Sequence, residues 1–318
     1  MVINIKEKKD ELHIGHLSTA YHTNFILMQE KELAEDLDKR ISWHQFGTGP
    51  AMVKAFQRNE IDIGYMGLPP AIIAIEKGIP IKCVAGGHVE GTIMVAPSKY
   101  KRFGELDQSL ANTFSQFKGK AIGVPSKGSI HDIILNFYLD KLDLKEEIKV
   151  LNYGQAEFIA YNMQRGNLGA GVGTPALAAF SYTLLDSHIV ISPDSLWKDN
   201  PSYGIFFHKK LIDKQPEIVK SFLNHDKSAS NMLRNSPDRA AQLITKSFPL
   251  MNKKYVKSVL EISPKYCIAL SEGYISSTMK FVDALYKLHY IEKPLKEHDI
   301  FLLDFVKELH PEPHHYVR

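Results

Sequence analysis

The chain has 318 residues, of which 44% are apolar and 24% are charged, a composition typical of globular proteins large enough for about two domains. Its formal net charge is only +3, and lysine and arginine are interleaved with aspartate and glutamate, so we expect no nucleic-acid partner. Cys83 and Cys267 are far apart and form no CxxC pair, which indicates neither a disulfide framework nor a zinc site.

The first ten residues, MVINIKEKKD, contain neither the apolar stretch nor the small-residue cleavage site of a signal peptide. No window approaches 18 consecutive apolar residues, the minimum for a membrane span. Two locations therefore stay open. The protein is cytoplasmic if the chain is complete, and extracytoplasmic (periplasmic or membrane-anchored) if a leader was removed.

Strands and helices alternate from the start of the chain, a pattern typical of parallel sheets. The residues predict strands at 12–17, 41–46, 61–66, 81–85 and 92–96. Helices are expected over 22–38, after Pro50 and over 71–77. A glycine-rich segment, 86–91, is expected to join the last two strands.

Near residue 97 the chain is expected to enter a second lobe, where a polar segment, 103–117, precedes a new series of strands. These strands are predicted at 121–124, 148–152, 170–173 and 189–191, and one at 203–207 could carry the chain back. From residue 216 onward the pattern is almost wholly helical. We therefore predict one lobe from 1–97 plus about 204–318, a second from 98–203, and a ligand cleft between them.

Two of the predicted strand–loop–helix units carry a glycine-rich turn, at 47–49 and at 126–129. A helix that opens on glycine, serine or threonine leaves its first backbone N–H groups unpaired, and the helix dipole there favours negative charge. One such turn in each lobe predicts a cleft that closes on a small anion from both sides. The alternative is that both turns are ordinary helix caps.

Four segments of the first 100 residues carry a family resemblance: IGHLSTAYHTN at 14–24, FGTGPAMVKA at 46–55, NEIDIGYMGLPPA at 59–71 and KGIPIKCVAG at 77–86. In this order and spacing they resemble the solute-binding proteins of ABC importers for nitrate, sulfonates and taurine, a group that includes binders of thiamine-pyrimidine precursors. A looser match, beginning with GKAIGVPSKGS at 119–129, continues to about residue 200.

The resemblance implies an α/β fold of the two-lobed type II periplasmic-binding-protein class, with a two-strand hinge and, here, a helical C-terminal region. It implies a monomer that captures a small anionic ligand (a sulfonate, nitrate, a carboxylate or a phosphorylated heterocycle). Such a protein delivers its ligand to ABC permease subunits. No cofactor is expected.

By the family pattern, the ligand contacts come from the loops that follow the strands. In the first lobe these residues are Ser18, Thr19, Tyr21, His22, Gly47, Thr48, Gly49, Met66, Gly67 and Leu68. In the second lobe they are Ser126, Gly128, Ser129, Tyr153 and Thr174. Open parallel sheets bind ligands beyond the carboxyl ends of their strands, and this general rule selects the same positions.

The chain has 14 histidines, and we expect none of them to hold a metal. His13 and His16 point to opposite sides of a strand, since side chains alternate along it. His22 and His131 lie inside the predicted ligand loops and are expected to donate hydrogen bonds to the ligand, and the alternative is that both are surface or capping histidines. We interpret the tail, with His310, His314 and His315, as a solvated segment that could take up a stray metal.

An enzyme is the main alternative to a binding protein. The GxSxG, HExxH, P-loop and GxGxxG motifs are absent from the sequence. Relatives of the same fold include cytoplasmic enzymes of cofactor biosynthesis, among them the pyrimidine synthase of thiamine biosynthesis, but its cysteine-rich iron-associated motif is not present here. A ligand sensor would use the same cleft without an importer.

Overall fold

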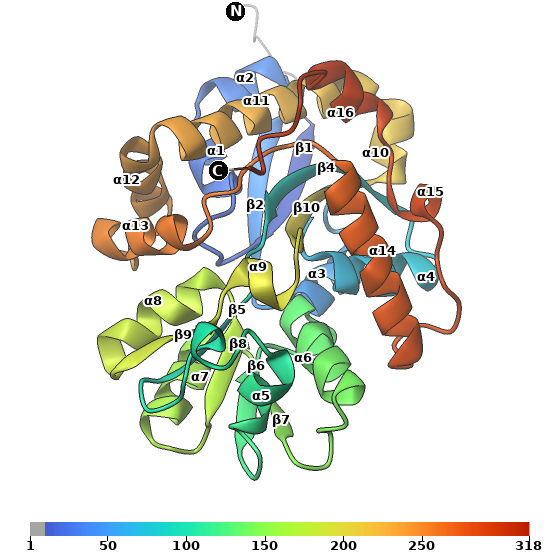
Figure 1. The fold of residues 1–318 in the computed structure, drawn as a ribbon. Coiled ribbons are helices and arrows are strands. Elements are labelled where there is room, and N and C mark those ends of the chain that lie inside the picture. Colours follow the sequence, from blue (N-terminus) through green and yellow to red (C-terminus); the bar gives the residue numbers. More distant parts are fainter. Residues whose placement is uncertain (1–9, 318) are drawn as a thin grey trace, which may run out of the picture.

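The computed structural model describes residues 10–317, which form two α/β lobes, one above the other in Figure 1. Each lobe contains a five-stranded sheet, in the orders β2-β1-β3-β10-β4 and β7-β6-β8-β5-β9. We refer to the first sheet and its helices as lobe 1 and to the second as lobe 2. The N-terminal stretch 1–9, whose sequence lacks the features of a leader, lies outside the described residues.

Both sheets follow one plan. In lobe 1, β1 pairs in parallel with β2 and β3, and β10 runs antiparallel between β3 and β4. In lobe 2, β6 pairs in parallel with β7 and β8, and β5 runs antiparallel between β8 and β9. The strands of lobe 1 are β1 (Glu11–Leu17), β2 (Arg40–Phe46), β3 (Ile63–Met66), β4 (Ile81–Val89) and β10 (Pro201–His208). Those of lobe 2 are β5 (Ile93–Pro97), β6 (Ala121–Val124), β7 (Lys149–Asn152), β8 (Ala170–Gly173) and β9 (Ser187–Ile191).

The antiparallel strand of each sheet is the one that arrives from the other lobe. The chain crosses once between β4 and β5 and once between α9 and β10. Glu90 N donates to Asn200 O at 2.6 Å, so the two crossing segments are bonded to each other. The chain leaves the first sheet after Val89 and enters the second at Ile93. The lobe boundary near residue 97 stays a prediction.

Helices cover the faces of both sheets. In chain order, lobe 1 begins with α1 (Asn24–Leu27), α2 (Glu32–Asp36), α3 (Gly49–Gln57) and α4 (Leu68–Glu76). Lobe 2 contains α5 (Leu110–Ser115), α6 (Ile130–Lys141), α7 (Ala156–Gln164), α8 (Pro175–Leu184) and α9 (Pro193–Leu196), with a short 3₁₀ turn at Phe103–Glu105.

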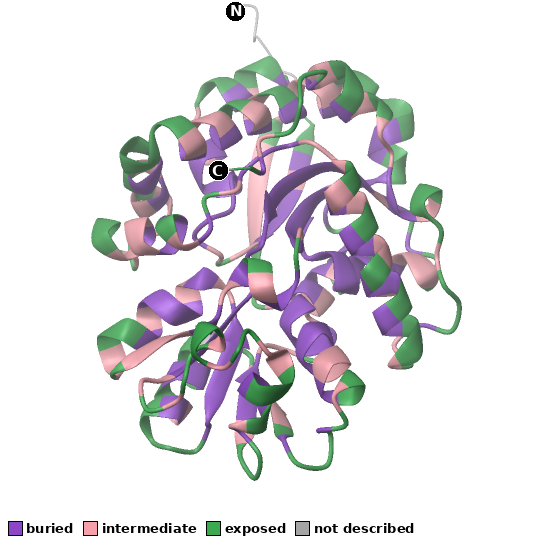
Figure 2. Ribbon diagram, in the orientation of Figure 1, coloured by how far each residue is buried: buried purple, intermediate pink, exposed green. Residues whose placement is uncertain are grey.

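The C-terminal part returns to lobe 1 and is helical, as predicted. Its helices are α10 (Lys209–Lys214), α11 (Pro216–Asn235), α12 (Pro237–Ser247), α13 (Lys253–Ile262), α14 (Glu272–Lys287), α15 (Glu297–Ile300) and α16 (Asp304–Leu309). Figure 2 shows buried strands inside and exposed outer faces on the helices. One apolar cluster runs through both lobes, from Met52 on α3 to Ile133 on α6 and Phe281 on α14.

The predicted fold class, two α/β lobes with a helical C-terminal region, is confirmed. Among residues 10–317, no helix combines the length and the apolar character that crossing a bilayer requires.

The helix predicted over 22–38 is wrong, because the chain forms two short helices, α1 and α2, separated by a turn. At the turn, Gln29 N and Glu30 N bond to carbonyls three residues back rather than four. His225 of α11 bonds to Glu30 at 3.0 Å and to Asp36 at 3.0 Å. These contacts with a distant helix hold the turn between α1 and α2 in place. No local sequence pattern predicts the break.

The glycine-rich segment 86–91 is not the connecting loop that the sequence predicts, since β4 continues through it to Val89. A Cβ on Gly87 would lie 2.0 Å from Cε2 of Tyr203 on β10. The glycine is therefore required by the close approach of a buried tyrosine ring, not by a turn.

Candidate functional site

The predicted ligand loops lie at the carboxyl ends of parallel strands in both sheets. The loops after β1, β2 and β3 leave the first sheet at one edge, and those after β6, β7 and β8 leave the second in the same way. The two edges meet, because a Cβ on Gly67 at the start of α4 would lie 2.7 Å from Cδ1 of Ile130 in α6. The fold thus brings together the edges that carry the predicted residues.

The loop after β1 turns from solvent into the protein. Ser18 is exposed and Thr19 is half-buried, whereas Tyr21 and His22 are only 2% exposed. His22 N donates to Thr19 O at 3.0 Å, which closes the turn. The backbone therefore directs the two aromatic residues of this loop inward.

His22 packs on Tyr203, with ring centroids 4.1 Å apart, and its Nδ1 is buried without a hydrogen-bond partner. Burial holds the pKa of His22 well below the ordinary value, and the neighbouring His16 and His88 lower it further. The imidazole is neutral at physiological pH, so it offers one donor and one acceptor rather than a positive charge.

Tyr21 extends to the first crossing. Its ring lies 4.7 Å from that of His88 on β4, and its hydroxyl would be 2.9 Å from a Cβ on Gly91. Burial raises the pKa of the Tyr21 phenol, which keeps it protonated. The loop after β1 and the crossing between the lobes therefore share one buried surface.

A buried network of hydrogen bonds holds the loop after β1 in place. Thr23 Oγ1 donates to Asp226 Oδ1 at 2.6 Å, and Tyr65 Oη donates to the same oxygen at 2.7 Å. Tyr203 Oη lies 3.3 Å from Thr23 Oγ1. Asp226 comes from α11, about 200 positions away in the sequence, so the C-terminal helices hold the loop that carries Tyr21 and His22.

The turn after β2 caps α3. Thr48 is the N-cap, and its Oγ1 accepts from Ala51 N at 3.3 Å. Gly47 is exposed, and a Cβ there would meet nothing within 4 Å. Gly49 is buried, and a Cβ there would lie 2.7 Å from Cγ of Pro70. Of the two glycines, Gly47 faces open space, and Gly49 packs against α4.

Met66, Gly67 and Leu68 follow the third strand and are all buried. Gly67 is the N-cap of α4, and it has no side chain with which to cap the helix. Here the backbone alone could face a ligand.

The turn after β6 caps α6. Ser129 is the N-cap, and its Oγ accepts from Asp132 N at 3.3 Å. Gly128 has φ +80°, a left-handed conformation that favours glycine. Both glycine turns are thus helix caps, and whether they also hold an anion stays a prediction.

Asp132 is a residue that the sequence interpretation missed. Its carboxylate is 1% exposed and accepts from Gly128 N at 2.8 Å, so one amide of the turn is already bonded within the chain. Tyr290 Oη donates to Asp132 Oδ2 at 2.7 Å, and the amides of Asn136 and Asn152 donate to Oδ1 at 3.1 Å and 3.0 Å. The Tyr290 bond connects the C-terminal region to lobe 2 at the start of α6.

The first crossing reaches His131 through Thr92, and the second crossing contacts Thr92 through Asn200. Thr92 Oγ1 lies 3.3 Å from His131 Nδ1 and accepts from Asn200 Nδ2 at 2.8 Å. Burial lowers the pKa of His131 to about 4, so this ring is also neutral at physiological pH. Thr92 and Asn200 are therefore further candidates for the site. Their only sequence signal is their position at the two crossings.

Tyr153 and Thr174, two further predicted residues, lie at neighbouring strand ends, and Ser126, in the turn after β6, is half-buried. Tyr153 follows β7, is half-buried, and has a pKa raised by burial. Thr174 is the half-buried N-cap of α8, and its side chain makes no capping hydrogen bond. Its hydroxyl is not used by the helix that it precedes.

Two surface hollows lie away from these loops. One, of about 370 Å³, is lined by Arg102, Tyr182, Ser187, His188 and Ile189. The other, of about 410 Å³, lies over the C-terminal tail and includes His310, Glu312 and His314 among its lining residues. The predicted ligand residues line neither hollow.

The interpretation of the tail as a solvated segment is wrong at His310 and Tyr316, which are buried, whereas residues 311–314 are exposed. His310 is 7% exposed and Tyr316 is 5% exposed, and the Tyr316 hydroxyl donates to Cys267 O at 2.7 Å. His314 is exposed, and His315 is half-buried. A buried tyrosine and its hydrogen bonds hold the tail against lobe 1.

Comparison with known proteins supports the resemblance seen in the sequence. The taurine-binding periplasmic protein of Escherichia coli (strain K12) is 23% identical over 234 residues, which cover 70% of this chain and 68% of that protein.

Two solved structures have the same fold. The ligand-binding component of an ABC-type import system from Staphylococcus aureus, with zinc bound, superposes with a TM-score of 0.77 at 15% identity, covering 96% of this chain and 100% of that one. The periplasmic aliphatic sulphonate binding protein SsuA from Escherichia coli superposes with a TM-score of 0.76 at 17% identity, covering 92% of each chain.

The profile of the NMT1-like family matches residues 5–246, well over half of the sequence. The segments that carry the resemblance at the sequence level all lie inside this match. The chain therefore belongs to the NMT1-like family.

Proposed function

We propose that this protein is a solute-binding protein that captures a small anion, with organic sulfonates the leading class, for an ABC-type importer. The observation that carries the proposal is the meeting of two strand-end edges, each followed by capped helices, at the junction of two lobes joined by a double crossing. The relative from Escherichia coli is named as a taurine-binding protein and one structural neighbour as a sulphonate-binding protein.

The chemistry of the predicted residues suits such a ligand. Backbone N–H groups at Gly47 and Gly67 and hydroxyls at Ser126 and Thr174 would give charge-assisted hydrogen bonds to oxyanions, each worth roughly 1.5–3 kcal/mol. The neutral ring of His22 would add one more donor. Two lobes connected by two crossings could open and close around the ligand by a hinge motion.

As a carrier for an importer, the protein would act outside the cytoplasm as a monomer and present both lobes to permease subunits. The cytoplasmic cofactor-biosynthesis enzyme and the ligand sensor remain the alternatives. Because an enzyme converts what it binds, the fate of the ligand separates the enzyme from the carrier.

The first prediction concerns ligand class. In a thermal-shift screen with nitrate, taurine, alkanesulfonates, dicarboxylates and pyrimidine phosphates, at least one sulfonate should stabilise the protein. A ligand that binds only the folded state adds about 2.7 kcal/mol at 100 times its Kd. Recovery of that compound unchanged, by mass spectrometry after incubation, is expected of a carrier. Conversion of the compound, or stabilisation by pyrimidine phosphates alone, would contradict the proposal.

The second prediction concerns the two helix turns. Gly47→Asp and Ser129→Asp should each weaken binding of the stabilising anion by about 100-fold, measured by titration calorimetry. At an effective dielectric constant of 20, like charges 5 Å apart repel by about 3 kcal/mol. Both changes should leave the fold intact, because Gly47 faces open space and aspartate caps helices as well as serine does.

Matched controls place the same substitutions elsewhere. Ser109 caps α5 through its Oγ, which accepts from Asn112 N, and a Cβ on Gly104 would meet nothing within 4 Å. Ser109→Asp and Gly104→Asp should bind the anion with unchanged affinity. Undiminished affinity in Gly47→Asp and Ser129→Asp would show that neither turn contacts the ligand.

A further inference from the structure

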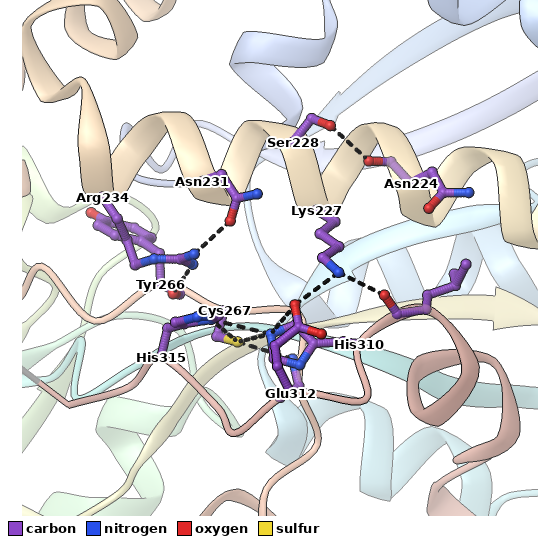
Figure 3. A network of polar contacts seen from close by, with 12 residues as sticks. Asn224, Lys227, Ser228, Asn231, Arg234, Tyr266, Cys267, His310, Glu312 and His315 are labelled. Carbon is purple, nitrogen blue, oxygen red and sulfur yellow. Dashed lines mark hydrogen bonds and ion pairs between the residues drawn. The ribbon is translucent and has the colours of Figure 1, made fainter.

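Three side chains of types that can bind a metal converge where the C-terminal tail packs on lobe 1 (Figure 3). Cys267 lies between α13 and α14, His310 follows α16, and His315 belongs to the tail. Cys267 Sγ is 3.2 Å from His310 Nε2 and 3.6 Å from His315 Nδ1, and the two ring nitrogens are 3.1 Å apart. The cluster lies outside the loops assigned to the ligand.

Hydrogen bonding alone does not satisfy this triangle. A ring nitrogen of neutral histidine is either a donor or an acceptor, never both, and each acceptor nitrogen has a single lone pair. If one ring nitrogen donates to the other, the acceptor has no lone pair left for the thiol. At most two of the three contacts can therefore be hydrogen bonds at once, whereas one cation could use all three lone pairs.

The spacing fits a tetrahedral zinc ion. Zn–N bonds of about 2.05 Å and a Zn–S bond of about 2.3 Å place two nitrogens about 3.3 Å apart and a nitrogen and sulfur about 3.6 Å apart. The observed separations of 3.1 Å, and of 3.2 Å and 3.6 Å, need changes of only a few tenths of an ångström. Thiolate and imidazole together are the donors that zinc prefers.

The surroundings favour a bound thiolate and hold two of the donors in place. Ala269 N donates to Cys267 Sγ at 3.5 Å. The Tyr316 hydroxyl donates to Cys267 O at 2.7 Å and to Ala269 O at 2.8 Å, which fixes the tail beside the cysteine without any metal. Cys267 is 1% exposed, and His310 lines part of the nearby surface hollow.

One carboxylate and two cationic side chains lie close to the cluster. Glu312 Oε1 is 3.6 Å from His310 Nε2, and it is paired with Lys227 Nζ at 2.8 Å. Arg234 donates to Tyr266 O at 2.7 Å, one residue from the cysteine. A bound thiolate and the Glu312 carboxylate supply two negative charges, and Zn²⁺, Lys227 and Arg234 supply four positive charges.

We propose that Cys267, His310 and His315 bind one Zn²⁺, with the fourth position left for Glu312 or water. On binding, the thiol releases its proton to solvent and the sulfur becomes the anionic ligand. The ion fastens the tail to the segment beside β4, where Cys267 N donates to Gly87 O at 3.1 Å and Gly86 N donates to Ile268 O at 2.8 Å. The Staphylococcus aureus neighbour shares only the fold at 15% identity, so the proposal rests on the donors of this chain.

The experiment uses untagged full-length protein, stripped with a chelator, then titrated with Zn²⁺ in a competition assay and with Co²⁺ in an absorption spectrometer. We expect one Zn²⁺ per chain, a higher Tm with zinc, and for Co²⁺ the intense visible bands of tetrahedral coordination with a thiolate-to-metal charge-transfer band. Cys267→Ser and His315→Ala should each lower the zinc affinity by about 100-fold or more. With Co²⁺, Cys267→Ser should abolish the thiolate charge-transfer band, and His315→Ala should abolish the tetrahedral spectrum.

His314→Ala is the matched control, since His314 is an exposed histidine of the same tail and should leave zinc binding unchanged. His315 is half-buried, so His315→Ala should fold normally, which circular dichroism can check. The proposal is overturned if the native protein takes up no zinc at micromolar concentration. It is also overturned if His315→Ala binds zinc as the native protein does, or if the cobalt complex lacks a thiolate band.

Discussion

Replacing Asp226 by asparagine is expected to remove a loss of stability that the native protein undergoes between about pH 4 and pH 7. Asp226 is fully buried, and burial raises the pKa of its carboxyl group to about 7, although hydrogen bonds from Thr23 and Tyr65 oppose the rise. In the unfolded chain an aspartate ionises near pH 4. Between these values the folded protein holds a proton that the unfolded chain has lost, so the free energy of unfolding falls as pH rises.

The expected size follows from the interval between the two pKa values. About three pH units of differential ionisation correspond to a change on the order of 3–4 kcal/mol, complete above pH 7. The measurement is urea unfolding of the native protein and Asp226→Asn at several pH values from 4.5 to 8. The difference in free energy of unfolding, native minus variant, should decrease steadily to about pH 7 and then stay constant.

Two buried histidines also titrate in this range, and they change the free energy of unfolding in the opposite direction. Burial lowers the pKa of His88 and of His131 to about 4, so each makes the protein more stable as pH rises from about 4 to 6.5. The native protein and the Asp226→Asn variant both contain these histidines. Their contributions therefore cancel in the difference between the two free energies of unfolding. Asp283→Asn, on the exposed face of α14, makes the same substitution outside the buried network and serves as the matched control. A pH-independent difference for Asp226→Asn would refute the expectation.

Trp197→Ala should lower the free energy of unfolding by about 3–5 kcal/mol, as truncation of large buried aromatic residues does. Trp197 lies in the crossing between α9 and β10 and is 6% exposed. Its ring stacks on Phe281 of α14 at 4.7 Å, and its Nε1 donates to Ser277 Oγ at 2.9 Å. On the other side its ring meets Phe137 of α6 edge-on at 5.2 Å. The side chain therefore joins a helix of lobe 2 to a C-terminal helix.

Two variants separate the parts of this effect. Trp197→Phe keeps an aromatic ring against Phe281 but loses the bond to Ser277, and it should cost roughly 1–3 kcal/mol. Trp43→Ala removes a half-buried tryptophan from the edge strand β2 and should cost less than Trp197→Ala. Urea unfolding measures all three. A Trp197→Ala variant no less stable than Trp43→Ala would show that the packing around the crossing contributes little.

Much of the fold could be predicted because its elements have local signals. The turns at 47–49 and 126–129 have a local signal, and the alternative interpretation of both as helix caps agrees with the bonds that Thr48 and Ser129 accept. The α1–α2 break was not visible, since it depends on His225, almost 200 positions away. Contacts between distant segments, not local preference, decided where the sequence was misread.

The candidate site divides in the same way. Strand ends and glycine turns selected Gly47, Ser129 and their neighbours, but Asp132 and Asp226 came from no motif. Both are buried carboxylates that accept hydrogen bonds from residues of other segments, as Asp132 does from Tyr290 and Asp226 from Tyr65. A carboxylate on a helix is normally interpreted as a solvated side chain, and only the assembled fold shows that these two bond to the loops predicted to bind the ligand.

The placement of β10 has a consequence for the order of assembly. Strand β10 pairs with both β3 and β4, and it begins only at Pro201, so the sheet of lobe 1 lacks its connecting strand until two thirds of the chain exists. The sheet of lobe 2 uses residues 93–191 without interruption. During synthesis, the lobe encoded second can complete its sheet first, because its strand pairings close shorter loops. The strands within residues 11–89 then remain incompletely paired until β10, which follows lobe 2 in the sequence, has been synthesised.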